Sequence, residues 1–209
     1  ASLRATDEHP FLTPRGWVPA SDLRPGDVVA APKSYLPPRQ PVTGPTTVEA
    51  KVLGYLLGDG SLSAAHNVAF VNPDTALLDA YRTAVDSVFG PQHYTPTPRA
   101  RGVTTLNTSS GSGGGSTPGP VLTWLRSLGL KAPATRWRDG GPTSAEKFVP
   151  ERFLSANEDV VAALLAALWD CDGSVSRPGT SLSFSYKTIS PQLAEDVQFL
   201  LLRLGIRSQ

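Results

Sequence analysis

The sequence predicts an α+β fold of two similar halves, the second of them truncated, preceded by a small all-β unit. Three observations support this prediction. A helix–turn–strand segment is repeated within the chain, a proline-rich stretch separates the first residues from the rest, and turns punctuate the short apolar runs of the N-terminus. We expect three parts, at residues 1–46, 47–155 and 156–209.

Residues 1–31 have the pattern of short strands joined by turns. Apolar pairs lie on both sides of Pro14–Gly16, and a second turn at Pro25–Asp27 precedes Val28 and Val29. Residues 32–46 hold five prolines, a density that excludes a helix interior and predicts an extended connector. A second stretch of low complexity, the Gly/Ser-rich residues 109–119, predicts a mobile loop without chemistry.

The internal repeat joins an apolar helix to an acidic turn. Residues 52–63, VLGYLLGDGSLS, recur as residues 165–176, LAALWDCDGSVS, and each copy ends in Asp-Gly-Ser-x-Ser. The duplication covers a whole supersecondary unit, because each motif is followed by a β-like stretch and then by a helix with an apolar face: residues 68–71 and 74–89, and residues 182–186 and 190–204.

Small residues recur at every fourth position of both helical copies, so each helix carries a narrow stripe of small side chains. If the helices pair along these stripes, Asp59 and Asp172 lie side by side, within reach of a shared divalent metal. The plainer interpretation is that each Asp-Gly only ends a helix in a turn, but two matching copies favour the site. The stripes consist of Gly54 and Gly58 in one copy and of Ala163, Ala167 and Cys171 in the other.

The two copies resemble the paired motifs of LAGLIDADG homing endonucleases, in the single-chain form that carries both. The first copy, Gly-Tyr-Leu-Leu-Gly-Asp-Gly-Ser-Leu, is similar to the DOD-type form inserted in inteins. Residues 6–13, with Gly16-Trp17 and residues 23–29, resemble the Thr-x-x-His block of an intein splicing (Hint) domain. The resemblance implies two pseudo-symmetric αββαββα halves preceded by a partial Hint segment.

The resemblance also implies roles for five residues. Asp59 and Asp172 would hold Mg²⁺ and orient water for attack on the scissile phosphates, and Lys147 would polarise that water or stabilise phosphate charge. In the splicing segment, His9 would protonate or polarise the peptide at the upstream junction, while Thr6 would donate a hydrogen bond to the developing oxyanion. Cys171 lies within the second motif, where a small residue is expected for packing.

DNA contacts are expected from the sheets that follow each motif, because such sheets lie in the major groove in this family. Residues 91–152 agree with this expectation, since they hold eight basic and three acidic residues. Lys187, in the strand-like stretch after the second motif, stays outside the predicted catalytic set. The candidates for phosphate or guanine contacts are Arg99, Arg101, Arg136 and Arg138.

The expected function is metal-dependent, site-specific cleavage of both DNA strands at an intein-free allele. The expected partners are double-stranded DNA with a long recognition site and a host extein protein in cis, and a replicative DNA helicase is the first candidate host. We expect a monomer. A location in the cytoplasm is expected because the chain has one cysteine and residues 1–8 lack a signal-peptide pattern. No membrane partner is expected, since no apolar run reaches about 18–20 residues. Two alternatives stay open: a degenerate insertion kept for splicing, and a non-cleaving DNA-binding protein of the same fold.

The arithmetic of the repeat predicts a fragment. The unit from Asp59 to the residue before Asp172 holds 113 residues, whereas 37 residues follow Asp172. We therefore expect the second half to be truncated and double-strand cleavage to need the longer parent chain. Neither splice junction is present between Ala1 and Gln209, so we expect no splicing by this chain alone.

Overall fold

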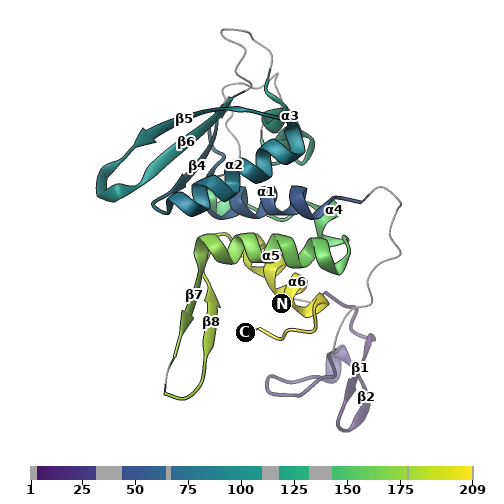
Figure 1. The fold of residues 1–209 in the computed structure, drawn as a ribbon. Helices are drawn as coiled ribbons and strands as arrows, with labels where there is room; N and C mark the ends of the chain where they lie inside the picture. The colour runs from purple at the N-terminus through teal and green to yellow at the C-terminus, as the bar shows by residue number, and fades with distance from the viewer. Residues whose placement is uncertain are drawn as a thin grey trace.

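A computed structural model describes residues 4–31, 44–64, 67–109, 118–131, 143–177 and 179–208. Two helices, α1 (Thr47–Gly58) and α5 (Glu158–Asp172), lie side by side in the middle of the molecule (Figure 1), and each leads into antiparallel strands. The architecture is α+β, as predicted. The proline-rich connector and the Gly/Ser-rich loop fall largely on residues 32–43 and 110–117, outside the described residues.

The first half has the predicted order of helices and strands. Its strands form one antiparallel sheet in the order β3-β4-β6-β5, and α2 packs on this sheet through Tyr81, whose ring stacks on Phe70 at 4.6 Å between centroids. After α1 the elements are β3 (Gly60–Ser61), β4 (Val68–Asn72), α2 (Thr75–Phe89), β5 (His93–Pro98), a 3₁₀ turn (Ala100–Gly102), β6 (Thr104–Ser109) and α3 (Pro120–Ser127).

The second half repeats this order as far as its second helix. The strands β7 and β8 pair as a two-stranded antiparallel ribbon, and α6 follows them. Within the described residues, no helix is both long and apolar enough to cross a bilayer. The elements of the linker and of this half are a 3₁₀ turn (Ser144–Glu146), α4 (Glu151–Leu154), β7 (Gly173–Ser176), β8 (Ser183–Tyr186) and α6 (Pro191–Arg203).

Side-chain caps fix where the main helices begin. Thr46 and Glu49 form a capping box at α1, in which each side chain accepts a hydrogen bond from the backbone N–H of the other residue. Asn157 caps α5 by accepting from the backbone N–H of Val160. The helices that follow the two motifs begin alike, since Asp74 caps α2 and Ser190 caps α6. Equivalent caps at equivalent places support the predicted duplication.

The close approach of α1 and α5 depends on the glycines of the first motif. A Cβ atom at Gly54 would lie 2.6 Å from the Leu164 carbonyl oxygen and 2.7 Å from Ala167 Cβ. A Cβ atom at Gly58 would lie 2.5 Å from Cys171 Cβ. Because Gly54 faces residues 164–168 and Gly58 faces Cys171, the two helices run parallel and end together. The small-residue stripes therefore meet, as predicted.

The glycine after each acid is required for space rather than for a left-handed turn. Neither Gly60 nor Gly173 has a positive φ, and Gly173 is extended at φ −79°, ψ 152°. A Cβ at Gly60 would collide with the Leu56 carbonyl, and one at Gly173 would collide with Trp169. The chain thus leaves each helix tightly against its own last turn, which sets the direction of the acid before the glycine.

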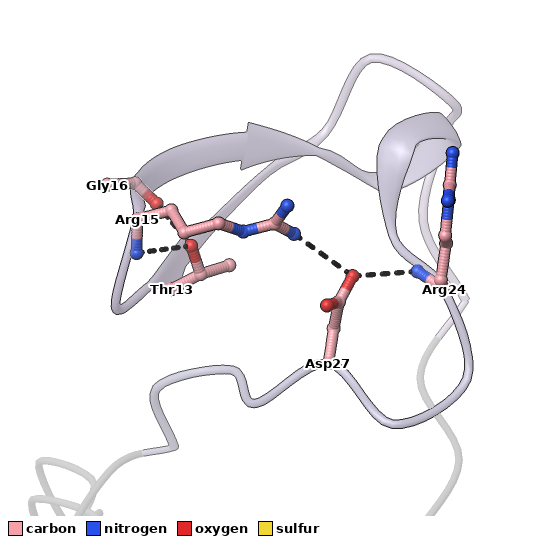
Figure 2. Close-up of polar contacts among 5 residues, drawn as sticks. All are labelled: Thr13, Arg15, Gly16, Arg24 and Asp27. Atoms are coloured by element: carbon pink, nitrogen blue, oxygen red, sulfur yellow. Dashed lines mark hydrogen bonds and ion pairs between the residues drawn. The ribbon is translucent and has the colours of Figure 1, made fainter.

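The N-terminal unit is a hairpin of β1 (Pro10–Thr13) and β2 (Gly16–Pro19), followed by a 3₁₀ turn (Ala20–Asp22). Figure 2 shows how Asp27 ties the next loop to this hairpin: its carboxylate accepts from the Arg24 backbone N–H at 2.8 Å and from the Arg15 guanidinium at 3.2 Å. The Thr13 hydroxyl closes the turn by donating to the Gly16 carbonyl. The strand pair is confirmed, but Val28 and Val29 form no strand.

We predict that Gly54→Ala destabilises the protein, although alanine favours helix by about 1 kcal/mol. The added methyl group collides with the α5 backbone, so we expect a loss of about 1–3 kcal/mol in the free energy of unfolding. Urea unfolding measures this loss. Lys51→Ala, at an exposed position of the same helix, is the control and should change stability little. A Gly54→Ala protein as stable as the parent would show that α1 and α5 do not pack this closely.

Candidate active site

The two acids of the repeat occupy equivalent places at one end of the helix pair. Asp59 is the residue that ends α1, and Asp172 is the last residue of α5. A helix C-terminus carries partial negative charge, so each carboxylate lies where the helix dipole disfavours it. Two parallel helices that end together therefore concentrate negative potential at this point, which favours a bound cation.

Asp59 is held by a buried side chain from the strand that follows it. The Asn72 amide nitrogen donates to the Asp59 carboxylate at 2.6 Å, and Asn72 is 7% exposed. Its amide oxygen accepts from the backbone N–H of Asp74 at 2.7 Å, which fixes the orientation of the side chain. Asn72 was not predicted from the sequence. Its place at the end of the strand after the motif is the signal that could have indicated it.

Asp172 is held differently. Thr188 takes the place that Asn72 has in the first half, since its hydroxyl accepts from the backbone N–H of Ser190, the residue that caps α6. Within the described part of the chain, the Asp172 carboxylate accepts no hydrogen bond. Burial raises the pKa of Asp172, and the negative charge of Asp59 raises it further against the opposing effect of Lys147. The two carboxylates therefore interact electrostatically, as a shared site requires.

Lys147 enters the site from the linker between the halves. Its side chain is buried, and its ammonium group donates to the carbonyls of Leu57 at 2.9 Å and Gly58 at 2.8 Å. These carbonyls belong to the last turn of α1, so the lysine neutralises a helix end that already bears an acid. Burial lowers the pKa of Lys147, while the charges of Asp172 and Asp59 favour its protonated form. The structure thus brings Lys147 together with both acids.

Helix α6 holds the linker that carries Lys147. The Ser190 hydroxyl donates to the Lys147 carbonyl at 2.6 Å, and the Asp196 carboxylate accepts from the Val149 backbone N–H at 2.7 Å. Arg203 donates to two carbonyls of the linker, those of Leu154 and Ala156. These three α6 side chains are at most 5% exposed. Buried polar groups of this kind are costly to leave unpaired, so they fix the linker in one position.

An open pocket of about 340 Å³ lies at this end of the helices. Two lysines, Lys147 and Lys187, and one acid, Asp172, are among the residues that line it. Such a mixture suits a phosphodiester, because the cations bind phosphate oxygens while the carboxylate can hold a metal or orient water. The lining residues are Leu57, Gly58, Ser144, Lys147, Asp172, Lys187, Thr188 and Ile189. Ser144, Lys187 and Thr188 were not among the predicted site residues.

The donor set fits a metal that is shared with a substrate. The described residues contain no cluster of three or more His, Cys, Asp or Glu side chains able to enclose a metal. Asp59 and Asp172 supply two carboxylates, and Mg²⁺ is commonly bound by one or two carboxylates together with substrate phosphates and water. Burial raises the pKa of the Tyr186 hydroxyl, and the negative charge of Asp172 raises it further against the opposing effect of Thr188. Tyr186 is therefore a neutral phenol beside the acids.

Cys171 has the packing position that the sequence indicated. Its side chain faces the backbone of Gly58, and its thiol lies 3.9 Å from the Tyr55 carbonyl oxygen. Burial, together with the charge of Asp59, raises the pKa of the thiol. The group is therefore a neutral thiol at ordinary pH, which suits a small packing residue.

The other predicted residues that the structure describes lie on other elements than the acids. Arg99 and Arg101 are on the turn between β5 and β6. Thr6 and His9 share a tight turn in which the His9 backbone N–H donates to the Thr6 carbonyl at 3.0 Å. The remaining two candidates for DNA contact, Arg136 and Arg138, lie outside the described residues.

The family comparison supports the second motif. A protein-family model described as "LAGLIDADG-like domain" matches residues 159–209. Among solved structures, an I-DmoI variant in complex with its target DNA and Mn aligns with a TM-score of 0.51 at 14% identity, covering 78% of this chain and 78% of that chain. I-DmoI is a homing endonuclease. The chain has the LAGLIDADG homing-endonuclease fold.

Three relatives with different names align with this chain over most or all of its length. Replicative DNA helicase DnaB of Rhodothermus marinus is 33% identical over 100% of this chain and 21% of the helicase. Protein RecA of Mycobacterium bovis is 31% identical over 100% of this chain and 25% of RecA. The DNA gyrase A protein of Mycobacterium kansasii is 31% identical over 92% of this chain and 33% of the gyrase protein. The chain thus spans between a fifth and a third of the length of these relatives.

We predict that Asp172→Asn stabilises the protein at pH 7. The raised pKa of Asp172 means that the folded state binds a proton more tightly than the unfolded state, so the contribution of this group to stability falls as the pH rises above about 4. Removing the charge restores this part of the free energy of unfolding. The difference between variant and parent should vanish in acid, where Asp172 is protonated. Thermal unfolding of variant and parent at several pH values measures this difference in stability. Asp170→Asn, an exposed carboxylate of the same helix, should show no such gain.

We predict that Lys147→Met destabilises the protein by about 1–3 kcal/mol, because it leaves two carbonyls at a covered helix end without a donor. Urea unfolding of the variant measures the loss. The matched control is Lys187→Met, since Lys187 is exposed and lines the same pocket. Equal stabilities of the two variants would contradict a capping role for Lys147.

Proposed function

We propose that this chain is the nuclease core of an intein-borne homing endonuclease, which hydrolyses both strands of a DNA duplex at a long, specific site with Mg²⁺. The observation that carries the proposal is the meeting of Asp59 and Asp172 at the shared end of two closely packed helices, where Lys147 bonds to the last carbonyls of α1. Mg²⁺ held there would activate water and neutralise charge on the scissile phosphates.

The residues of the chain divide the remaining work. Asp59, fixed by Asn72, and Asp172 hold the metal and orient the attacking water. Lys147 keeps its ammonium group beside both acids, and the more exposed Lys187 reaches phosphate oxygens at the mouth of the pocket. The sheets of the two halves bind the DNA, with Arg99 and Arg101 on the turn between β5 and β6 of the first sheet.

An intein setting explains the pattern of relatives. A helicase, a recombination protein and a gyrase have different names, yet each aligns with nearly the whole chain over a minor part of its own length. An element that inserts into different host genes accounts for this distribution. Residues 1–46 then belong to the splicing segment, in which Thr6 and His9 act at the upstream junction, and residues 47–155 and 156–209 are the two nuclease halves.

The fourth prediction tests the proposal on the complete parent protein. With Mg²⁺ and a supercoiled plasmid that carries the intein-free host allele, we expect linear product from the parent. Asp59→Asn and Asp172→Asn should each abolish cutting of at least one strand, because each removes a metal ligand, while DNA binding persists. Gel electrophoresis separates supercoiled, nicked and linear DNA, and Asp170→Asn serves as the control.

The alternatives predict other results. A degenerate insertion kept for splicing would leave the plasmid supercoiled, although the parent protein still splices. A non-cleaving DNA-binding protein would retain the plasmid in a gel-shift assay without nicking it. Unchanged cleavage by both Asp variants would exclude the assignment of these acids.

A further inference from the structure

We propose that Arg99 is a base-specific contact that reads a guanine in the major groove, with Thr105 as the residue that positions it. Arg101, two residues away, contacts the phosphate backbone instead. The inference rests on the proposed DNA binding and assigns different roles to two arginines that the sequence could not distinguish. It follows from the geometry of the β5–β6 hairpin.

Strand register defines the face on which Arg99 lies. Leu106 is 4% exposed, and the Thr108 hydroxyl lies 3.2 Å from the Tyr81 hydroxyl, so these two residues of β6 face the core. Thr105 and Asn107 alternate with them and face the opposite, outer side of the sheet. Figure 1 shows that the β5–β6 hairpin and the β7–β8 hairpin both project beyond the ends of α1 and α5 that carry the acids.

The outer face has hydroxyl and amide groups in register. Thr95 pairs with Asn107, and Thr97 pairs with Thr105. On the β4 side these rows meet Ala69 and Val71, and the Asn107 amide oxygen accepts from the Asn67 amide nitrogen at 2.7 Å, one residue before β4 begins. Neutral donors and acceptors in fixed rows suit the edges of base pairs better than they suit phosphates.

The Arg99 side chain is oriented on this face. Its Nε donates to the Thr105 hydroxyl oxygen at 3.1 Å, and its backbone N–H donates to the Val103 carbonyl at 2.7 Å. Thr105 itself is 8% exposed. Within the described part of the chain, the two terminal amino groups of Arg99 make no hydrogen bond. The guanidinium therefore offers a pair of donors in a defined direction, as a bidentate contact to guanine O6 and N7 requires.

Arg101 lacks this support. It lies at the tip of the turn with a left-handed backbone, φ 59°, and makes no hydrogen bond or ion pair to another described residue. An exposed arginine whose side chain no neighbour holds can follow a phosphate but cannot aim two donors at one base. Both arginines contribute the same charge, so non-specific attraction to DNA is common to both, and only Arg99 is placed to discriminate.

The experiment selects binding sites from a pool of randomised DNA duplexes, using the full 209-residue chain with Ca²⁺ in place of Mg²⁺, and sequences the enriched DNA. The variants are Arg99→Lys, Thr105→Val and Arg101→Lys. The two lysine substitutions preserve charge and differ only in position. Circular dichroism of each variant confirms that the fold is retained.

We expect the parent to enrich a motif with a guanine, and Arg99→Lys to reduce the preference for that guanine by about ten-fold, because lysine cannot make the bidentate contact. Thr105→Val should weaken the preference at the same base pair to a smaller degree, and Arg101→Lys should leave the motif unchanged. The inference is overturned if Arg99→Lys keeps the guanine or if Arg101→Lys loses it. A parent that binds every duplex alike also overturns it, whereas failure to bind any duplex overturns the proposed function itself.

Discussion

The absence of a side chain at two positions of one helix governs the rest of the structure. Gly54 and Gly58 let α1 contact the backbone of α5, at distances that a single methyl group would prevent. Because the helices are parallel and in contact, their last residues meet, and the acids that end them share one site. A wider separation would leave Asp59 and Asp172 as two unrelated surface carboxylates.

This arrangement costs stability, and the structure contains specific compensation. Two carboxylates, two negative helix ends and partial burial all act in the same unfavourable direction. Lys147 offsets them with a buried cation bonded to the α1 terminus, and Asn72 supplies a hydrogen bond to one acid. The position of Lys147 depends in turn on buried polar groups of α6. A chain selected for stability alone would need none of these groups, so their presence supports a functional interpretation of the site.

The sequence predicted those features that depend on local spacing. The repeat indicated the order of helices and strands, the small residues indicated the helix pairing, and the two Asp-Gly steps indicated the acids. Asn72, Thr188 and the α6 contacts were missed, because they join residues whose proximity comes only from tertiary structure. The two valines after Pro25–Asp27 were expected in a strand, but within the described residues they join no ladder. Ala30 beside them donates one backbone hydrogen bond to the Leu12 carbonyl, and a single bond does not make a strand.

Pseudo-symmetry fixes where the acids lie, but the neighbouring strands decide how each is held. Asn72 and Thr188 occupy matching places and bond to matching backbone groups, yet only Asn72 also donates to the acid of its own half. Threonine has a single polar side-chain atom, and in Thr188 that atom accepts from the backbone, whereas asparagine has an oxygen for the backbone and a nitrogen for the acid. The two carboxylates are therefore held by different partners, although the helices that present them are equivalent. If both acids act on DNA, as proposed, the duplication supplies a symmetric frame that presents two acids with different surroundings to the two strands.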